Sequence, residues 1–161
     1  KATKDCQFEK VDVVDVKLPD STKPRYYGVT FLHGNRVMLA DGIQNQCIML
    51  SSSYEFITSY TLTGSPVSIC VVGDQEVAVS IPYHKTIQIL SVRDDIISPV
   101  RTITTQHTCY GITTAGTREM VVTGNCGNDK IYCMEVDVKS YHQYPGTIAI
   151  TNSKYTSHYL T

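Results

Sequence analysis

The stretch SPVSICVVGDQEVAVSIPYHKTIQILSV, residues 65–92, decides how the rest of the chain is interpreted. It alternates short apolar runs with polar turns, because GDQ and IPYHK separate VSICVV, EVAVS and TIQILSV. Runs of this length, rich in Val and Ile and bounded by Gly, Asp and Pro, are typical of β-strands joined by tight turns. The stretch therefore predicts a hairpin that continues into a third strand.

The same pattern occurs upstream and downstream, so the hairpin is part of a repeat. Aligning Val29, Ile69 and Ile112 gives separations of 40 and 43 residues. The first unit divides into GVTFL, RVMLA, QCIML and FITSYTL. The second divides into VSICVV, EVAVS, TIQILSV and VRTIT, with RDDIISP as the loop before its last strand. Helix signals are nearly absent, since no long stripe of apolar residues at helical spacing occurs.

Four short strands at a period of about 40 residues are the sequence signature of β-propeller blades. We therefore predict an all-β fold, a β-propeller of four-stranded antiparallel blades, in which the first strand of each blade lines the central channel and the fourth lies at the rim. Three full blades are expected at 26–65, 66–108 and 109–146.

The two ends of the chain predict pieces of further blades. Residues 8–18 predict one outer strand of a split blade, and residues 147–161 predict the start of a further blade, with its first two strands. Closed propellers often complete a blade with strands from both termini, which removes exposed sheet edges. Together these pieces supply three strands of a fourth blade, so a four-bladed ring is one alternative. Residues 1–161 are thus expected to be a single propeller domain or a fragment of one, and because the third strand of that blade is missing, we favour a part of a larger ring. We expect such a fragment to be able to associate with itself through exposed blade edges.

Composition excludes several function classes. The chain has 161 residues, with 14 Lys and Arg against 15 Asp and Glu, so its net charge is -1. This balance argues against a polybasic nucleic-acid binder and against an acidic tail. No window approaches the roughly 18 consecutive apolar residues of a membrane span, and KATKDCQFEK lacks the apolar core of a signal peptide. We therefore expect a soluble, cytoplasmic protein.

The six cysteines predict neither a zinc site nor a disulfide framework. No two of them have the spacing of a zinc knuckle. Cys47, Cys70 and Cys133 each lie inside an apolar strand-like run, where a reduced thiol behaves as a small hydrophobic residue. We expect buried free thiols, with no metal and no cofactor.

The sequence also carries a family resemblance. NRVMLADGIQNQCIMLSSSYEFITSYTL (35–62) and GDQEVAVSIPYHKTIQILSV (73–92) resemble NHL-repeat propellers, whose blades end a second strand with a small residue and Asp, followed by Asn and an apolar third strand. With VKLPDSTKPRYYGVTFL (16–32), the chain is similar to the carboxyl-terminal propeller regions of molluscan tripartite-motif (TRIM-like) proteins over residues 8–151. The second and third units depart from the pattern, with Ser80–Ile81 and Gly124–Asn125 at the place of the Asp.

The resemblance implies a recognition platform for protein or RNA. In this family, RING and B-box zinc modules elsewhere in the chain carry ubiquitin-ligase function, and nothing in these 161 residues resembles either module. We therefore assign no ligase activity and no other enzyme activity to this segment.

Propeller topology sorts the turns into two faces of opposite character. The connections from fourth to first strand and from second to third strand emerge on one face, which collects cations, tyrosines and histidines, with Asp41 and Asp129 as its main acids. The other turns collect mostly acids, including Glu55, Asp74, Asp94 and Asp95. Cations interleaved with aromatic rings suit an acidic or extended peptide, or the phosphates and bases of RNA. The predicted partner-binding residues are Arg25, Tyr26, Tyr27, Tyr83, His84, Lys85, His107, Tyr110, Asn128 and Lys130.

Three functions are compared on this basis. The first is recognition of a protein partner by that face, and the second is binding of single-stranded RNA by the same residues. The third is a propeller hydrolase or lactonase, which would need convergent carboxylates in the channel. GVTFL, VSICVV and GITTAG supply none, so this function ranks last. A Cys126 nucleophile with His107 as its base has little support because an unpaired Cys is ordinarily structural. An Asp94–Asp95 acid/base pair has little support because ordinary turn composition accounts for both residues.

Overall fold

The described part of the computed structural model consists of residues 13, 16, 18, 23–105, 107–115, 119–125, 131–137 and 143–148. These residues form twelve β-strands and two short 3-10 helices, η1 (His33–Asn35) and η2 (Pro82–His84). No helix among them is long and apolar enough to cross a membrane. The all-β prediction is confirmed.

The strands form three four-stranded antiparallel sheets, which we call blades 1, 2 and 3. Blade 1 contains β1 (Tyr26–Phe31), β2 (Val37–Asp41), β3 (Gln46–Leu50) and β4 (Phe56–Thr61). Blade 2 contains β5 (Ser68–Val71), β6 (Glu76–Ile81), β7 (Thr86–Arg93) and β8 (Ile96–Thr104). Blade 3 contains β9 (Thr108–Ala115), β10 (Glu119–Asn125), β11 (Ile131–Asp137) and β12 (Gln143–Ile148).

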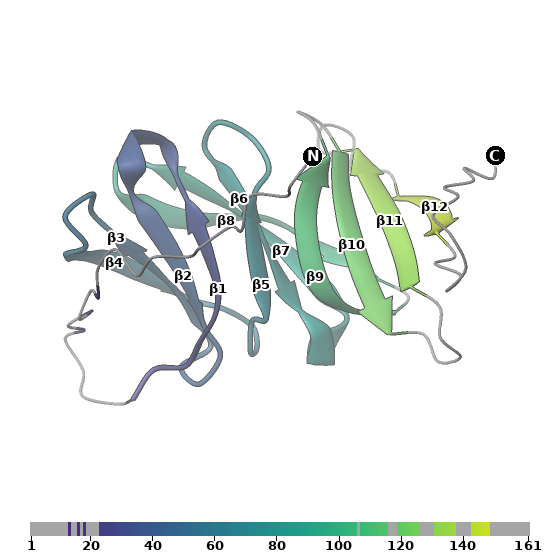
Figure 1. The fold of residues 1–161 in the computed structure, drawn as a ribbon, viewed down its shortest axis with the longest axis horizontal. Helices are drawn as coiled ribbons and strands as arrows, with labels where there is room; N and C mark the ends of the chain where they lie inside the picture. Colours follow the sequence, from purple (N-terminus) through teal and green to yellow (C-terminus); the bar gives the residue numbers. More distant parts are fainter. Residues whose placement is uncertain are drawn as a thin grey trace, which may run out of the picture.

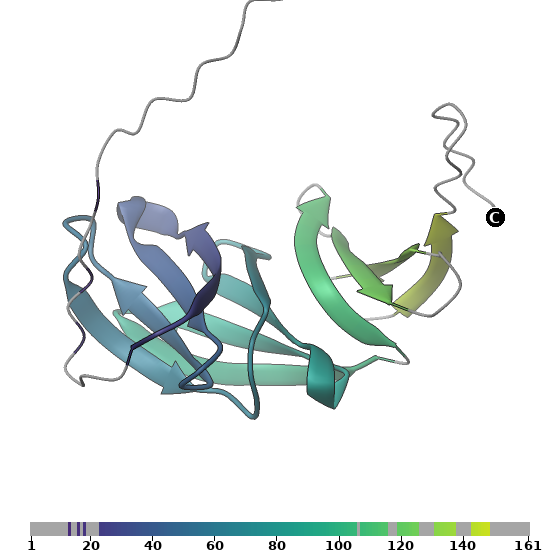
Figure 2. The ribbon, with the colours of Figure 1, turned by 60° about the horizontal axis from the view of Figure 1, so that its bottom comes forward.

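The first strands of the blades lie next to one another. Figure 1 shows β1, β5 and β9 side by side, and β1 contacts β5 as β5 contacts β9. Figure 2 shows the three blades in the same order from a second side, and buried apolar clusters join blade 1 to blade 2 and blade 2 to blade 3. Sheets stacked face to face around a row of inner strands are the arrangement of β-propeller blades. The chain is therefore a partial β-propeller.

The backbone register confirms the predicted repeat. Val29 pairs with Leu39 in blade 1, Ile69 with Val79 in blade 2, and Ile112 with Val122 in blade 3. The three residues aligned by sequence thus occupy the same position in their blades. Positions of the three blades can therefore be compared one by one.

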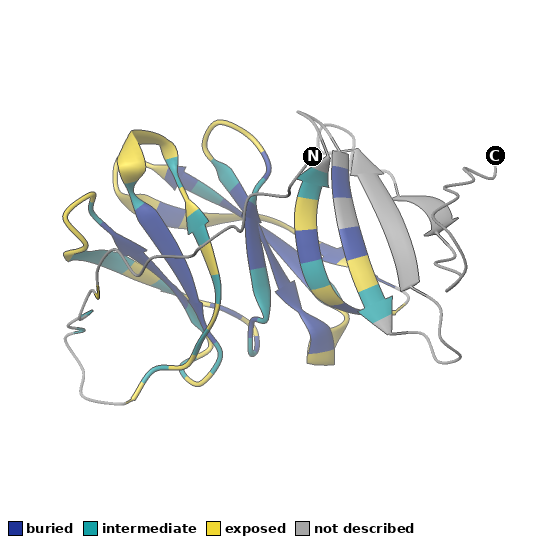
Figure 3. Cartoon of the chain, viewed as in Figure 1, coloured by how far each residue is buried: buried dark blue, intermediate teal, exposed yellow. Residues whose placement is uncertain are grey.

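The core lies between the blades. Met38, Ala40 and Met49 of blade 1 cluster with Ile69, Val79 and other residues of blade 2. Cys70, Ala78 and Ile87 of blade 2 cluster with Ile112 and Val122 of blade 3. Every residue of β2 is buried, and so are all but the first of β6 (Figure 3). A strand that is covered on both faces needs an apolar side chain at almost every position, which explains runs such as VMLA.

One strand is longer than expected. The sequence predicts that RDDIISP is a loop, but β8 begins at Ile96 and includes Pro99. Because β8 is the edge strand of its sheet, a proline there removes no ladder hydrogen bond from a second neighbour. The register of the β7–β8 pair shifts next to this proline: Leu90 pairs with Pro99 and Ile89 with Arg101, so Val100 of β8 is an extra residue.

The structure does not place the two ends of the chain as the sequence predicted. Thr147 and Ile148, which we expected to begin that blade, belong to β12 and pair with Tyr132 and Ile131 of β11. Blade 3 therefore extends past the expected boundary at residue 146, and residues 149–161 lie outside the described residues. The expected outer strand at 8–18 also lies mostly outside them; the described residues Val16 and Leu18 form no strand but pack against the outward face of blade 1.

A buried hydroxyl connects blades 2 and 3. Ser80 is fully buried; its Oγ accepts a hydrogen bond from the backbone N–H of Ser68 at 3.0 Å and donates to the carbonyl oxygen of Tyr110 at 3.1 Å. Thr123 occupies the same position in blade 3, and its Oγ1 accepts from the N–H of Gly111 at 3.1 Å. These contacts satisfy backbone groups where the first strand of a blade starts.

We expect Ser80→Ala to lower the free energy of unfolding by about 1–3 kcal/mol, because it leaves the Ser68 N–H and the Tyr110 carbonyl without their partner. Urea titration monitored by circular dichroism measures the change. Ser59→Ala, at an exposed position of β4, is the matched control and should change stability by less than about 0.5 kcal/mol. Equal losses in both variants would contradict a structural role for the Ser80 hydroxyl.

Cys47 and Cys70 are buried free cysteines, as the sequence predicts. Cys109 is buried as well, whereas the side chain of Cys133 lies outside the described part of the chain. Burial raises the pKa of both Cys47 and Cys70 from 9.0 to about 12. Both thiols therefore remain neutral in the folded chain over the pH range in which they ionise in the unfolded chain.

Because the folded pKa is raised, the stability contribution of these thiols is complete below about pH 9 and is lost as the pH rises toward about 12. We expect the urea midpoint to fall over that range, and a Cys47→Ala, Cys70→Ala double variant to show a smaller fall. Iodoacetamide labelling of the native chain, read by peptide mass spectrometry, should leave both residues unmodified until urea is added. Rapid native labelling of Cys47 would contradict the burial.

Candidate functional site

The antiparallel order of the strands divides the loops into two sets at opposite ends of the sheets. One end carries residues 23–25, the β2–β3 turn, residues 62–67, the β6–β7 turn and residues 105 and 107. The other end carries the β1–β2, β3–β4, β5–β6 and β7–β8 turns. We call the first end the cationic face and the second the acidic face, for the charges described next.

The charges of the described loops differ between the two faces. Lys23, Arg25 and Lys85 are exposed on the cationic face. The described loops of that face contain no acid, and Asp41, at the end of β2 beside them, is fully buried. The acidic face exposes mainly carboxylates, with Arg93 as the exposed arginine among Glu55, Asp74, Asp94 and Asp95. The expected asymmetry of charge is therefore present in the described part of the chain.

Asp41 accepts backbone hydrogen bonds that the sequence did not predict. Its Oδ1 accepts backbone hydrogen bonds from Arg25 at 3.1 Å, Ile43 at 3.0 Å and Gln44 at 3.4 Å. The carboxyl group thus closes the β2–β3 turn and holds the segment before β1 against it. Asp41 was expected to be a main acid of this face, and its burial corrects that expectation.

Tyr26 also differs from its predicted environment. Its ring packs against the apolar cluster on the outward face of blade 1, and its hydroxyl is buried without a described partner. Burial, and secondarily the charge of Asp41, raise the pKa of Tyr26. Of the predicted binding residues with described side chains, Tyr26 is the one whose polar group is covered.

Hydrogen bonds between loops make the cationic face continuous across blades. The N–H of Gly42 donates to the Arg25 carbonyl at 3.0 Å, and the Ser65 hydroxyl donates to the Gly42 carbonyl at 2.9 Å. The second bond joins blade 1 to the connection that enters blade 2. Further along, the N–H of Thr105 donates to the Lys85 carbonyl at 2.8 Å, which holds the entry to blade 3 beside the β6–β7 turn.

Three exposed tyrosines lie on this face. Tyr27 is 49% exposed, Tyr83 is 86% exposed and Tyr110 is 46% exposed. Tyr27 and Tyr110 precede Gly28 and Gly111, which occupy the same position of their blades, so these two rings stand at the start of inner strands. The guanidinium of Arg25 donates to the Tyr27 hydroxyl at 3.4 Å, and this bond raises the pKa of Arg25.

Two glycines allow rings to lie close to the backbone. A Cβ atom on Gly42 would come within 2.2 Å of the Tyr27 ring, and one on Gly64 would come within 2.8 Å of the His84 ring. His84 belongs to η2, the short helix that replaces a tight turn between β6 and β7. Lys85 follows it with a left-handed backbone (φ 52°), so the sequence PYHK presents three exposed side chains in succession.

The structure brings together most, but not all, of the predicted site. Arg25, Tyr27, Tyr83, His84, Lys85, His107 and Tyr110 are exposed at the same end of the sheets. Asn128 and Lys130 lie outside the described residues. One residue was missed: Ile43, which is 53% exposed in the β2–β3 turn. An isoleucine inside the polar turn DGIQN was the available signal, since turns are usually polar.

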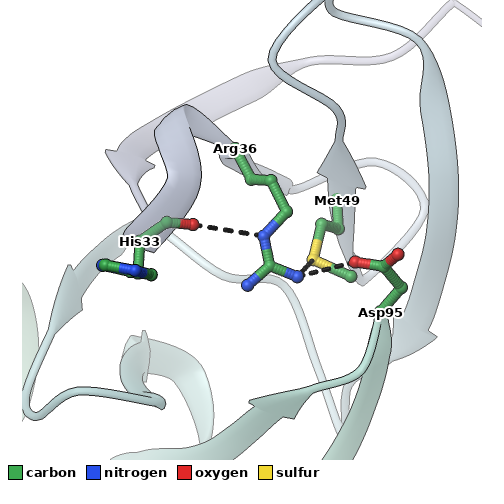
Figure 4. A network of polar contacts seen from close by, with 4 residues as sticks. All are labelled: His33, Arg36, Met49 and Asp95. Carbon is green, nitrogen blue, oxygen red and sulfur yellow. Dashed lines mark hydrogen bonds and ion pairs between the residues drawn. The ribbon is translucent and has the colours of Figure 1, made fainter.

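The acidic face is held by a different contact between blades. The guanidinium of Arg36 is paired with the carboxylate of Asp95 at 2.6 Å, and it also donates to the carbonyl of His33 at 3.3 Å (Figure 4). The pair joins the β1–β2 turn of blade 1 to the β7–β8 turn of blade 2. A small hollow beside it is lined by His33, Asp74, Glu76 and other residues, but no group of described side chains there or elsewhere could hold a metal ion.

Comparison with known proteins identifies the fold alone. No protein-family model and no curated protein matches the chain. Solved structures that it resembles include the β-propeller domain of Cps50 (Swd1) from Myceliophteria thermophila, with a TM-score of 0.61 and 8% identity over 78% of this chain and 43% of that one. Virginiamycin B lyase from Staphylococcus aureus has a TM-score of 0.60 and 17% identity, over 79% of this chain and 42% of the lyase. The WD40 domain of Pan2 from Neurospora crassa has a TM-score of 0.59 and 13% identity, over 75% of this chain and 36% of that domain.

These likenesses establish a β-propeller and leave NHL-repeat membership as a prediction. The chain spans about two fifths of the length of the solved propellers that it matches. Since the three proteins share less than a fifth of their residues with this chain and differ in kind, its function has to be argued from its own surface.

We expect Asp41→Ala to lower the free energy of unfolding by about 1–3 kcal/mol, because three backbone N–H groups lose their acceptor. Asp41→Asn keeps an amide oxygen at that place and should lose clearly less. Urea titration compares both with Asp74→Ala, which removes an exposed acid from the acidic face. If Asp41→Asn were as destabilising as Asp41→Ala, the charge and not the acceptor would be what the fold requires.

Proposed function

We propose that this chain is a non-enzymatic recognition module that binds a protein partner through its cationic face. The observation that carries the proposal is the composition of that face. Three exposed cations and three exposed tyrosines lie in the loops or at the adjoining strand ends of this face, hydrogen bonds join several of these loops, and Asp41, the described acid at this end, is buried. Tyrosine and arginine are the residues most enriched at the energetic centres of protein interfaces.

The geometry supports binding of an extended, acidic segment of the partner. Tyr27, Tyr83 and Tyr110 come from blades 1, 2 and 3, so the rings are distributed across the face and not gathered in one pocket. Arg25 beside Tyr27, and Lys85 two residues after Tyr83, place a cation near two of these rings. Such spacing suits a peptide that contacts several blades with alternating carboxylate and apolar groups.

A catalytic role has weaker support. The inner strands β1, β5 and β9 contain no Asp, Glu, His or Lys, so they offer no carboxylate, imidazole or amine as a general acid or base, and their two cysteines, Cys70 and Cys109, are buried. The substrate-recognition role that the TRIM-like resemblance implies belongs to this proposal, with ligase chemistry assigned to modules outside these residues.

Single-stranded RNA binding is the second candidate, and one observation favours it: the same face alternates aromatic rings with cations, which suits both base stacking and phosphate contact. The two candidates differ in salt dependence. RNA binding should weaken with salt by a logarithmic slope of about −0.7 for each phosphate neutralised. A peptide held mainly by tyrosine contacts should show a much shallower dependence.

We expect Arg25→Glu and Tyr83→Ala each to weaken binding of an acidic peptide by roughly 30-fold, the effect of losing about 2 kcal/mol at an interface centre. The ligand would be selected from a displayed peptide library with the purified chain, and affinity measured by fluorescence anisotropy. Arg93→Glu and Tyr54→Ala are matched controls, because they make the same changes at exposed residues of the acidic face.

The proposal fails if the controls weaken binding as much as the two test variants, or if the library yields no ligand. Anisotropy with a labelled single-stranded RNA, repeated over a range of salt concentrations, tests the alternative. RNA binding with the steep slope, lost in Arg25→Glu, would replace the protein partner with RNA.

A further inference from the structure

Two of the exposed tyrosines of the cationic face are the extra residues of β-bulges. The register of β1 against β2 shifts between Tyr26 and Gly28, so Tyr27 is an extra residue in β1. The pairing of β9 with β10 skips Tyr110 in the same way. A bulge turns its extra side chain away from the direction that the regular pleat would give it. The same irregularity therefore presents a tyrosine at the start of the inner strand in blades 1 and 3.

The ring of Tyr27 lies over the β2–β3 turn. A Cβ atom on Gly42 would come within 2.2 Å of the ring's Cε2 atom and 2.4 Å of its Cδ2 atom, so the glycine is what lets the ring approach the turn. The hydroxyl at the end of the ring accepts a hydrogen bond from the guanidinium of Arg25 at 3.4 Å. The ring is thus held along its edge by the turn and at its hydroxyl end by the cation.

The turn under this ring presents an isoleucine. Ile43 follows Gly42 directly and is 53% exposed. The Oδ1 atom of Asp41 accepts hydrogen bonds from the N–H of Ile43 at 3.0 Å and from the N–H of Arg25 at 3.1 Å. One buried carboxylate therefore holds both the turn and the segment that leads to Tyr27. The ring and the isoleucine form a preformed apolar surface, on which little backbone freedom is lost when a partner binds.

Arg25 places a positive charge next to this apolar surface. Its side chain is exposed, and it forms no ion pair within the described part of the chain. A guanidinium has five N–H donors, so those not used on Tyr27 can bind a carboxylate, often through two parallel hydrogen bonds. Lys23, two residues earlier, is exposed as well and adds to the positive charge. The surface thus fits an apolar side chain that is accompanied by a carboxylate.

Blade 2 does not repeat this arrangement. Val67, which is partly buried, stands at the position of Tyr27, and Pro82 of η2 stands at the position of Gly42. In blade 3, the turn between β10 and β11 lies outside the described residues. Among the described loops, the combination of ring, isoleucine and cation is therefore a feature of blade 1.

We propose that Tyr27, Ile43 and Arg25 form an anchor site for an extended peptide segment in which an aliphatic residue and an Asp or Glu lie two positions apart. The inference rests on the proposed function and adds which side chains of the partner blade 1 selects. The aliphatic side chain packs on Ile43 and the Tyr27 ring, and the carboxylate binds the Arg25 guanidinium. Residues i and i+2 of an extended chain point to the same side, about 6.6 Å apart, whereas adjacent residues point to opposite sides. The spacing of two therefore follows from binding both groups to one surface.

Selection from a displayed library of random peptides with the purified chain tests the anchor site. We expect the selected peptides to be enriched in Leu, Ile or Val two positions from Asp or Glu. The most frequent peptide, labelled for fluorescence anisotropy, should bind Ile43→Ser about 10-fold more weakly than the wild-type chain, since a partly buried aliphatic contact is lost. Replacing the aliphatic residue of the peptide with alanine should weaken binding to the wild-type chain to a similar degree. It should add little in Ile43→Ser, because both changes remove the same contact.

Two matched controls accompany these variants. Ile96→Ser makes the same change at a residue that is 65% exposed on β8, and it should leave the affinity unchanged. Gly42→Ala places a methyl group where the Tyr27 ring lies and should also weaken binding, whereas Gly73→Ala has open space around the added methyl group and should not. Circular dichroism of all four variants separates loss of binding from loss of folding.

The outcomes separate this inference from the function on which it rests. Acidic peptides without an aliphatic preference would overturn the anchor site and leave recognition of an acidic partner standing. The same holds if the effects of Ile43→Ser and of the alanine peptide simply add, or if Ile96→Ser weakens binding as much as Ile43→Ser. A library that yields no ligand, including the case in which the chain binds labelled single-stranded RNA instead, would overturn both.

Discussion

Contact between neighbouring blades is the interaction on which the rest of this structure depends. A four-stranded sheet alone would expose two apolar faces, whereas here β2, β3, β6 and β7 are covered on both sides and almost completely buried. The apolar area removed from water lies mainly between sheets, so each blade owes its stability to its neighbours. Ile69 of β5, which packs against Met38 and Met49 of blade 1, is 5% exposed.

Where the inner strands begin, the side chains that accept backbone hydrogen bonds differ between the blades. Blades 2 and 3 use a hydroxyl, from Ser80 and Thr123, to accept the N–H of the first strand. Blade 1 has Ala40 at that position and instead places Asp41 one residue later, where it accepts three backbone N–H groups. The repeat thus meets one requirement, a partner for backbone groups where the inner strand begins, with two chemical groups, a hydroxyl in blades 2 and 3 and a carboxylate in blade 1.

Because the core lies between the sheets, the loops at the ends of the sheets contribute little to it. Their side chains can therefore form a binding surface. The cationic face gathers Arg25, Tyr27, Tyr83, Lys85 and Tyr110 from three blades, and hydrogen bonds through Gly42, Ser65 and Thr105 hold these loops in fixed relation. The acidic face is joined between blades by the Arg36–Asp95 pair. A rigid arrangement of exposed side chains is what a recognition surface needs, since less freedom is lost on binding.

The sequence by itself determined the all-β fold, the repeat and the sorting of charges between two faces. These features depend on local alternation and on the order of strands, and both are readable from runs such as EVAVS and turns such as PYHK. It also identified Cys47 and Cys70 as buried thiols from the apolar runs around them.

Only the tertiary structure decided what each residue touches. It buried Asp41 and the Tyr26 hydroxyl, kept Pro99 inside an edge strand, extended blade 3 to Ile148 and left Val29 and Phe31 exposed. In each case the outcome depends on a neighbour distant along the chain, an adjacent strand or an adjacent blade. Local sequence carries no information on whether that neighbour is present, because burial is a property of the assembled sheets.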